Sequence, residues 1–129
     1  MNRQAAADFL RFATVGASGF LVDTAVVYGL KDRLGLYGAG AVSYVVAATW
    51  VWWCNRVWTY AGRSSGSLVR QWWRFMVVNL SGLVLNRGTY AILVATSAEV
   101  RAYPVIAVAA GAVAGMFANF FLSRRLVYR

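Results

Sequence analysis

The sequence predicts an all-α, integral membrane four-helix bundle made of two tandem two-helix repeats, with the N- and C-termini in the cytoplasm. Of its 129 residues, 60% are hydrophobic and only 13% are charged, a composition too apolar for a soluble domain. Four apolar stretches approach the roughly 20 residues that a helix needs to span a bilayer. They are residues 12–30, 37–54, 75–96 and 103–122.

An internal repeat groups these stretches into two units. Segment 11–30 (RFATVGASGFLVDTAVVYGL) recurs 63 residues later as 74–93 (RFMVVNLSGLVLNRGTYAIL), and six of the twenty aligned residues are identical. The ends of the second and fourth stretches also align, CNRVWTY at 54–60 with LSRRLVY at 122–128. Repeats of this kind are common in transporter folds.

We predict a single transmembrane domain, residues 1–129, with two repeats and one linker. Repeat one covers about 9–60, repeat two about 72–128, and the linker 61–71. The start of the linker is rich in Gly and Ser, which favours a flexible connection. The other connections are short turns at 34–40 and 97–104, and Pro104 suits the first turn of the last helix.

The basic residues gather at one side of the predicted bundle. Nine arginines precede the first span, separate the second from the third, or follow the fourth: Arg3, Arg11, Arg56, Arg63, Arg70, Arg74, Arg124, Arg125 and Arg129. The positive-inside rule therefore places both termini and the linker in the cytoplasm, as expected for a multi-pass protein of the cytoplasmic membrane. In so apolar a chain, the net charge of +9 indicates anionic lipid headgroups as partners, and no nucleic acid.

The sequence lacks the groups that most enzymes and metal sites use. It has no histidine, a single cysteine (Cys54) and a single lysine, Lys31, which no glycine-rich loop precedes. The carboxylates fall in different predicted membrane layers: Asp8, Asp23, Asp32 and Glu99. Because no two of them can share a hydrolytic site, we expect no enzymatic activity, no cofactor and no metal.

Two charged residues lie near the expected midplane of the bilayer. Asp23 is eleven residues into the first span and Arg87 twelve residues into the third, which is about 16 Å deep. A lone charge at that depth costs at least about 2.5 kcal/mol, so we expect the two side chains to pair inside the bundle. The pair either locks the helices together or lines a polar path, and the sequence leaves both interpretations open.

Small and amide residues form a matched stripe on the first and third spans. Asn79, Gly82 and Asn86 share one face of the third span. The corresponding face of the first span carries Gly16, Gly19 and Asp23. If the two faces met, they would form a narrow polar groove, although amides buried in lipid also serve helix association.

The fourth span has a face of small residues spaced four apart: Ala107, Gly111, Gly115 and Asn119. Its GxxxG motif lets another helix approach closely, either from the same chain or from a second copy. Because four helices make a thin bundle, we expect a homo-oligomer.

Aromatic residues cluster at the predicted cytoplasmic boundary: Trp50, Trp52, Trp53, Trp58, Tyr60, Trp72 and Trp73. An interfacial aromatic belt is the usual role of such a cluster. The alternative is a platform on which a sugar ring stacks.

Arginines and asparagines together mark the cytoplasmic ends of the spans: Arg11, Asn55, Arg56, Arg74, Asn119, Arg124 and Arg125. Twelve of the thirteen basic residues are arginine, whose guanidinium binds phosphate oxygens in bidentate fashion. The pattern indicates phosphate capture. The alternative is that these arginines only fix the orientation of the chain in the membrane.

These motifs resemble those of the GtrA-like family of small four-span membrane proteins. The family has Arg-Phe at the start of the first and third spans, then a glycine and an acidic or amide residue, and Asn-Arg-x-Trp-x-aromatic at the end of the second. The matching residues are Arg11, Phe12, Gly16, Asp23, Asn55, Arg56, Trp58, Tyr60, Arg74, Phe75, Asn119, Arg124, Arg125 and Tyr128. The likeness runs from residue 9 to residue 128. Leu126 stands where the family usually has Trp, and Ser123 where the first repeat has Asn55.

The resemblance implies that the protein moves a polyprenyl-phosphate-linked monosaccharide across the cytoplasmic membrane for polysaccharide or cell-wall glycosylation. It also allows a role as a membrane anchor or recruiting subunit for a glycosyltransferase partner. The residues expected to bind the lipid-linked sugar are Arg11, Asp23, Asn55, Arg56, Arg74, Asn79, Asn86, Arg87, Asn119, Arg124 and Arg125. A small multidrug exporter fits less well, because it needs an uncompensated membrane carboxylate and Arg87 is expected to compensate Asp23.

Overall fold

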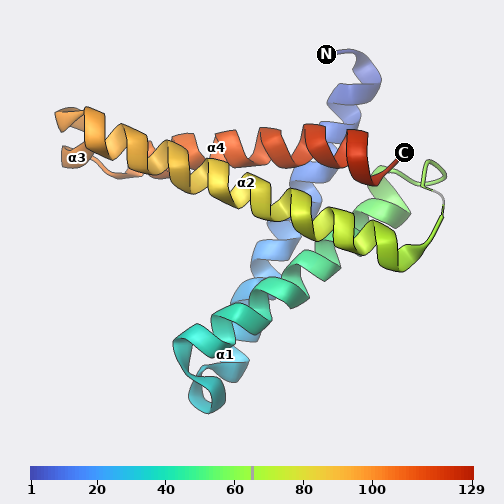
Figure 1. Ribbon diagram of the computed structural model, residues 1–129, viewed down its shortest axis with the longest axis horizontal. Helices are drawn as coiled ribbons and strands as arrows, with labels where there is room; N and C mark the ends of the chain where they lie inside the picture. Colours follow the sequence, from blue (N-terminus) through green and yellow to red (C-terminus); the bar gives the residue numbers. More distant parts are fainter. Residues whose placement is uncertain (65) are drawn as a thin grey trace. The chain divides into compact units, whose positions relative to one another are not determined.

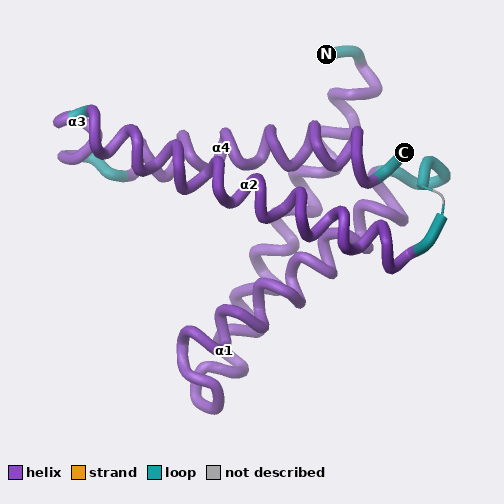
Figure 2. The backbone as a smooth tube through the Cα atoms, in the orientation of Figure 1, coloured by secondary structure: helices purple, strands orange, loops and turns teal. Residues whose placement is uncertain are grey.

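The fold is all-α, as the sequence predicts. The computed structural model describes residues 1–64 and 66–129, and in this part of the chain the backbone forms helices, turns and loops without a strand (Figure 2). The elements in chain order are α1 (Arg3–Cys54), the π-helix η1 (Asn55–Thr59), α2 (Leu68–Thr96), α3 (Ala98–Ala102), α4 (Val105–Leu122) and the π-helix η2 (Ser123–Val127). They divide into two compact units, Met1–Leu68 with Tyr128, and Val69–Val127 with Arg129.

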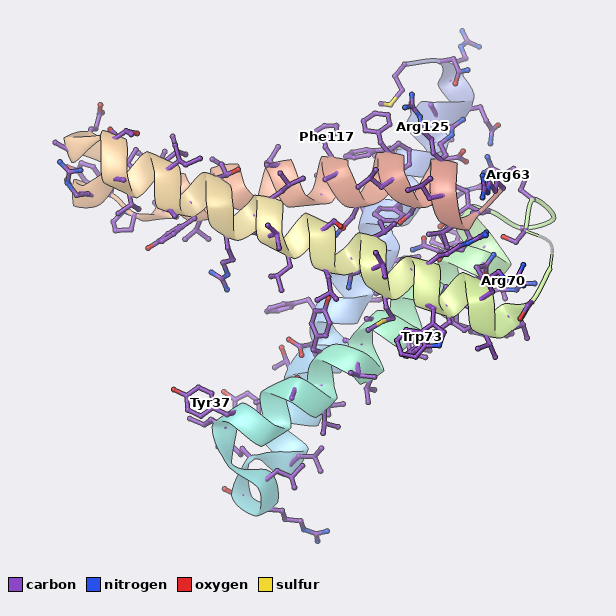
Figure 3. All side chains as sticks on the ribbon, viewed as in Figure 1. Tyr37, Arg63, Arg70, Trp73, Phe117 and Arg125 are labelled. Carbon is purple, nitrogen blue, oxygen red and sulfur yellow. The ribbon has the colours of Figure 1, made fainter. Side chains whose placement is uncertain are left out.

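In the first unit, α1 folds back on itself at Gly35 and makes an antiparallel hairpin (Figure 1). Gly35 has a φ of 73° and a ψ of 172°, in a region that glycine adopts far more readily than other residues. The Trp50 indole donates a hydrogen bond of 2.9 Å to the Ser18 hydroxyl, and Gly19 packs against Val51. The residue number midway between the two members of each pair is close to 35, as expected for two arms that reverse at Gly35 and run side by side. Tyr37, just beyond the reversal, projects from the hairpin almost fully exposed (Figure 3).

In the second unit, α2 and α4 form the second hairpin, and α3 lies in the turn between them (Figure 1). The Ser97 hydroxyl caps α3 by accepting a hydrogen bond of 3.3 Å from the backbone N–H of Val100. Pro104 directly precedes α4, and its carbonyl accepts the first backbone bond of that helix, from Val108. Pro104 therefore lies where the sequence suggests, whereas the expected simple turn contains a short helix.

Within residues 1–64 and 66–129, three helical segments are long and apolar enough to cross a membrane: Arg3–Thr59, Leu68–Thr96 and Val105–Val127. The first is bent at Gly35, and each of its arms exceeds the roughly 20 residues that one crossing needs. These segments support the assignment of the chain as a membrane protein. The count of four crossings and the cytoplasmic location of both termini stay predictions.

The two units bury matching positions. Pairs buried in both include Asp8 and Gln71, Phe12 and Phe75, Val15 and Val78, Gly19 and Gly82, Ala39 and Ala107, Ser43 and Gly111, Ala47 and Gly115, and Asn55 and Ser123. The offset between paired residues is 63 in the first arm and 68 in the second, a difference of five. Helix α3, which has five residues and no counterpart in the first hairpin, accounts for the difference.

Close backbone contact joins the helices of the second hairpin. A β-carbon at Gly111 would lie 2.5 Å from the backbone oxygen of Asn86, and one at Gly115 would lie 2.9 Å from that of Gly82. Both approaches are too short for any side chain larger than hydrogen. The GxxxG face therefore packs on α2 of the same chain, which answers the question that the sequence left open.

The packing also gives a partner to the polar stripe of α2. Within the second unit, the face that carries Asn79, Gly82 and Asn86 packs on α4. The corresponding face of α1 is also used within its own hairpin, because Gly19 contacts Val51. Gly16 is exposed, and among the described residues no atom lies within 4 Å of a β-carbon built on it. The contacts of Gly19, Gly82 and Asn86 are therefore made within their own hairpins.

The replacement Gly111→Ala should destabilise the second hairpin by about 1–3 kcal/mol, because the new methyl group meets backbone that cannot move aside alone. The matched control is Gly88→Ala in α2, where a β-carbon would have no neighbour within 4 Å among the described residues. The control should be neutral or stabilising by up to about 1 kcal/mol, from helix propensity. Thermal unfolding in detergent, followed by circular dichroism, compares the two. Equal melting temperatures would rule out the packing described here.

Candidate functional site

Both hairpins end in a π-helix at the same repeat position. Residues Asn55–Thr59 form η1 and Ser123–Val127 form η2, separated by the same offset that aligns the two sequence motifs. In η1 the backbone N–H of Tyr60 donates to the carbonyl of Asn55 at 2.8 Å, one residue further than in an α-helix. Short π-helical segments inside α-helices occur frequently at functional sites. The ends of the hairpins are therefore the first place to look for a binding site.

In the first unit, η1 carries a buried amide. Asn55 is fully buried, and its Oδ1 accepts a hydrogen bond of 2.6 Å from the Thr59 hydroxyl. Its Nδ2 is also buried and has no hydrogen-bond partner within the described part of the chain. A buried donor without an acceptor costs free energy, so this amide is a candidate ligand-binding group.

An ion pair lies at the same end of the first unit, and neither of its residues was predicted to belong to the site. The Asp8 carboxylate is fully buried and lies 2.8 Å from Nη2 of Arg63, whose side chain is 37% exposed. Gln4 donates to the same carboxylate oxygen at 3.0 Å. Arg63 Nη2 also donates to the backbone oxygen of Thr59 at 2.9 Å, which joins the ion pair to η1.

Aromatic rings surround this network. The Tyr60 and Tyr128 rings stack at 4.5 Å, and the Tyr128 hydroxyl donates to the backbone oxygen of Trp52 at 3.0 Å. The guanidinium of Arg63 lies 4.9 Å from the centre of the Tyr60 ring. Burial raises the pKa of Tyr128 far above its usual range, so this hydroxyl stays protonated and acts as a donor.

The outer tryptophans of the aromatic cluster, including Trp73 on α2, are exposed (Figure 3). Their exposure agrees with the role of an interfacial aromatic belt. Trp52 and Tyr60, by contrast, are buried and cannot offer a face to a sugar.

In the second unit, the amides meet between the two helices. Asn119 Nδ2 donates to Asn79 Oδ1 at 3.3 Å, while Asn86 lies against Gly111 and Gly115. Asn119 Oδ1 and the Ser123 hydroxyl are buried and have no hydrogen-bond partner within residues 1–64 and 66–129. The second hairpin therefore offers two buried acceptors, one in α4 and one in η2.

The hydropathy, the repeat and the motif residues at the two hairpin ends agree with one protein family. The family model described as the GtrA/DPMS transmembrane domain matches residues 11–128. The chain belongs to this family. No curated protein matches the chain closely enough to add a more specific relative.

The arginines expected to bind substrate in this GtrA/DPMS domain differ in exposure. Arg56 and Arg124, at equivalent positions of η1 and η2, are half-buried. The exposed arginines are Arg11, which lies 5.9 Å from the centre of the Trp58 ring, and Arg74, Arg87 and Arg125. Arg125 follows Arg124 in η2 (Figure 3). The site offers many donors, and among the described residues no group of three or more His, Cys, Asp or Glu side chains could hold a metal ion.

The two residues expected near the midplane of the bilayer lie in different units of this GtrA/DPMS domain. Asp23 is half-buried in α1 and Arg87 is exposed on α2. Because each unit is described by itself, the expected ion pair between them stays a prediction.

The replacement Asn79→Leu should lower stability by about 1–2 kcal/mol, because it leaves the Asn119 amide without its acceptor in an apolar surrounding. The double replacement Asn79→Leu with Asn119→Leu should recover part of that loss, since neither amide then stays unpaired. Thermal unfolding of the single and double variants in detergent measures both effects. Strictly additive losses would show that this amide pair does not stabilise the hairpin.

Proposed function

We propose that this GtrA/DPMS protein translocates a polyprenyl-phosphate-linked monosaccharide across the cytoplasmic membrane, for polysaccharide or cell-wall glycosylation. The observation that carries the proposal is the pair of matched π-helices, each with a half-buried arginine beside a buried polar group that lacks a partner. The family and the long apolar helices support a membrane substrate. The role is transport rather than catalysis.

The phosphate is assigned to the arginines of the π-helices. Arg56 directly follows Asn55 in the chain and Arg124 directly follows Ser123, so each π-helix carries a half-buried arginine next in sequence to a buried polar residue. A charge-assisted bond to phosphate is roughly twice as strong as a neutral hydrogen bond, and partial burial strengthens it further. Arg11, Arg74 and Arg125 are exposed and would attract the headgroup toward the membrane surface.

The sugar is assigned to the amides of the second hairpin. Asn119 Oδ1 is a buried acceptor that a sugar hydroxyl could satisfy, and Asn79 and Asn86 lie on the facing helix. Asp23 and Arg87 would line or gate the path near the midplane. Because the sequence has no ATP-binding motif, the substrate gradient would drive transport as an outer glycosyltransferase consumes the sugar.

The partners follow from this scheme: the polyprenyl-phosphate sugar, a glycosyltransferase, and further copies of the same chain. The homo-oligomer would give more helices to surround the headgroup than one chain supplies.

The second candidate is a membrane anchor that recruits the glycosyltransferase. It predicts that Asp23→Asn and Arg87→Gln leave function intact. Substitutions on the Gly111 and Gly115 face do not separate the candidates, because this face packs the second hairpin. Reconstitution without any transferase separates the two candidates, since only a translocase speeds lipid exchange by itself.

Purified protein in vesicles should accelerate the movement of a polyprenyl-phosphate sugar between leaflets, and Arg56→Gln should slow it by about tenfold or more, the effect of one charge-assisted hydrogen bond. The control is Arg33→Gln, which removes the same charge from an exposed position near the turn of the first hairpin. Failure of the unsubstituted protein to accelerate exchange would leave the anchor as the better candidate. An equal effect of both substitutions would remove Arg56 from the site.

A further inference from the structure

The ion pair of Asp8 and Arg63 is the strongest feature outside the path proposed above, and it lies wholly within the first unit. Arg63 Nη2 carries both described bonds, one to the Asp8 carboxylate at 2.8 Å and one to the Thr59 carbonyl at 2.9 Å. The N–H groups on Nε and Nη1 take part in neither bond. Figure 3 shows Arg63 on the segment that follows η1. The guanidinium is thus anchored through one nitrogen and retains other donors on a side chain that is 37% exposed.

The second repeat makes the same junction without charge. Gln71 occupies the position that corresponds to Asp8, and Val127 the position that corresponds to Thr59. The Gln71 amide donates directly to the Val127 carbonyl at 3.3 Å. A neutral side chain is therefore sufficient to tie the start of the hairpin to its π-helix.

Stability does not explain why the first repeat uses charges here. Removing a carboxylate and a guanidinium from water costs about as much as their attraction returns, so a buried ion pair is a weak source of stability. The Asp8 carboxylate is fully buried, while its partner reaches the surface. An arginine held in one orientation at the end of a membrane hairpin, with donors left over, fits an anion-binding role.

We propose that Arg63 receives the phosphate of a lipid headgroup and that Asp8 is an internal counter-ion that weakens this binding so that the phosphate is released. The Tyr60 ring, 4.9 Å from the guanidinium, holds its plane. Thr59 connects the pair to Asn55, whose buried Nδ2 offers a further donor. The inference deepens the proposed function and rests on it for the identity of the lipid as a polyprenyl phosphate.

The counter-ion solves a problem that any carrier has. An uncompensated guanidinium at a membrane surface holds phosphate strongly through charge-assisted bonds, whereas conduction needs binding that is weak enough for the ligand to leave. The negative charge 2.8 Å from Nη2 repels an incoming phosphate while it keeps Arg63 in place. Asp8 therefore lowers the affinity for phosphate and makes its release faster.

Binding to the full chain in detergent tests this, with a short-chain polyprenyl phosphate, phosphatidylglycerol and inorganic phosphate as separate probes. Asp8→Asn should bind polyprenyl phosphate about three- to tenfold more tightly, because it removes a repelling charge across a partly screened interface. Arg63→Gln should bind about tenfold more weakly. The matched controls, Asp32→Asn and Arg33→Gln, change the same charges at exposed positions near the other end of the hairpin and should leave affinity nearly unchanged.

Unchanged or weaker binding by folded Asp8→Asn protein would overturn the counter-ion role, and unchanged binding by Arg63→Gln would overturn the receptor role. Should Asp8→Asn fail to fold, the same measurement is made on Asp8→Gln, which carries the side chain that the second repeat has at the corresponding position. If the binding of either lipid requires Arg63, the headgroup site is supported. If only the binding of inorganic phosphate requires Arg63, the proposal that the phosphate belongs to a lipid is overturned.

Leaflet exchange separates this inference from the proposed function. Tighter binding with slower exchange in Asp8→Asn supports both. If the unsubstituted chain binds polyprenyl phosphate through Arg63 but accelerates no exchange, the transport function fails and the headgroup site stands.

Discussion

The structure depends on the close packing of helices at glycine residues inside each hairpin. Lipid tails are as apolar as leucine, so no hydrophobic force brings two membrane helices together, and association relies on van der Waals packing and hydrogen bonds. In the first hairpin the contact is at Gly19 and Val51, beside the bond from Trp50 to Ser18. In the second, Gly111 and Gly115 place α4 directly on the backbone of α2. Large apolar side chains then point outward, as the exposed Trp73 and Val77 do.

This way of packing determines where polar groups can remain. The small residues bring Asn119 against Gly82 and Asn86 against Gly111, which buries amides that water would otherwise satisfy. Among the buried polar groups that have no hydrogen-bond partner in the described part of the chain, three belong to the candidate site: Asn55 Nδ2, Asn119 Oδ1 and the Ser123 hydroxyl. Each costs about 1–3 kcal/mol. Two of the three lie at the first residue of a π-helix, and their position repeats although the side chains differ.

The sequence predicted the secondary structure well and the neighbours of each helix poorly. Hydropathy and repeat spacing indicated the helical hairpins, and Pro104 indicated the start of α4, because these signals are local. The stripe of Asn79, Gly82 and Asn86 was correctly placed on one face, but the sequence did not show that this face packs on α4. Both the first and the fourth spans carry small residues, and spacing along one helix cannot say which of them faces it. The π-helices escaped detection because they lie at helix ends, where no periodicity continues beyond them.

The ion pair of Asp8 and Arg63 was missed for a related reason. The two residues are far apart in the sequence, one near the start of α1 before the apolar stretch and one in the Gly- and Ser-rich linker, where charges are ordinarily solvated. Only the hairpin reversal at Gly35 brings them together. Once the fold is known, the repeat supplies an internal comparison that a single sequence rarely offers, because Gln71 occupies the same buried position with a neutral side chain. The two halves thus share their packing but differ in charge at one junction. A duplicated scaffold whose copies keep the same buried positions can change a single buried side chain without losing the hairpin, and the charged junction of the first repeat is such a change.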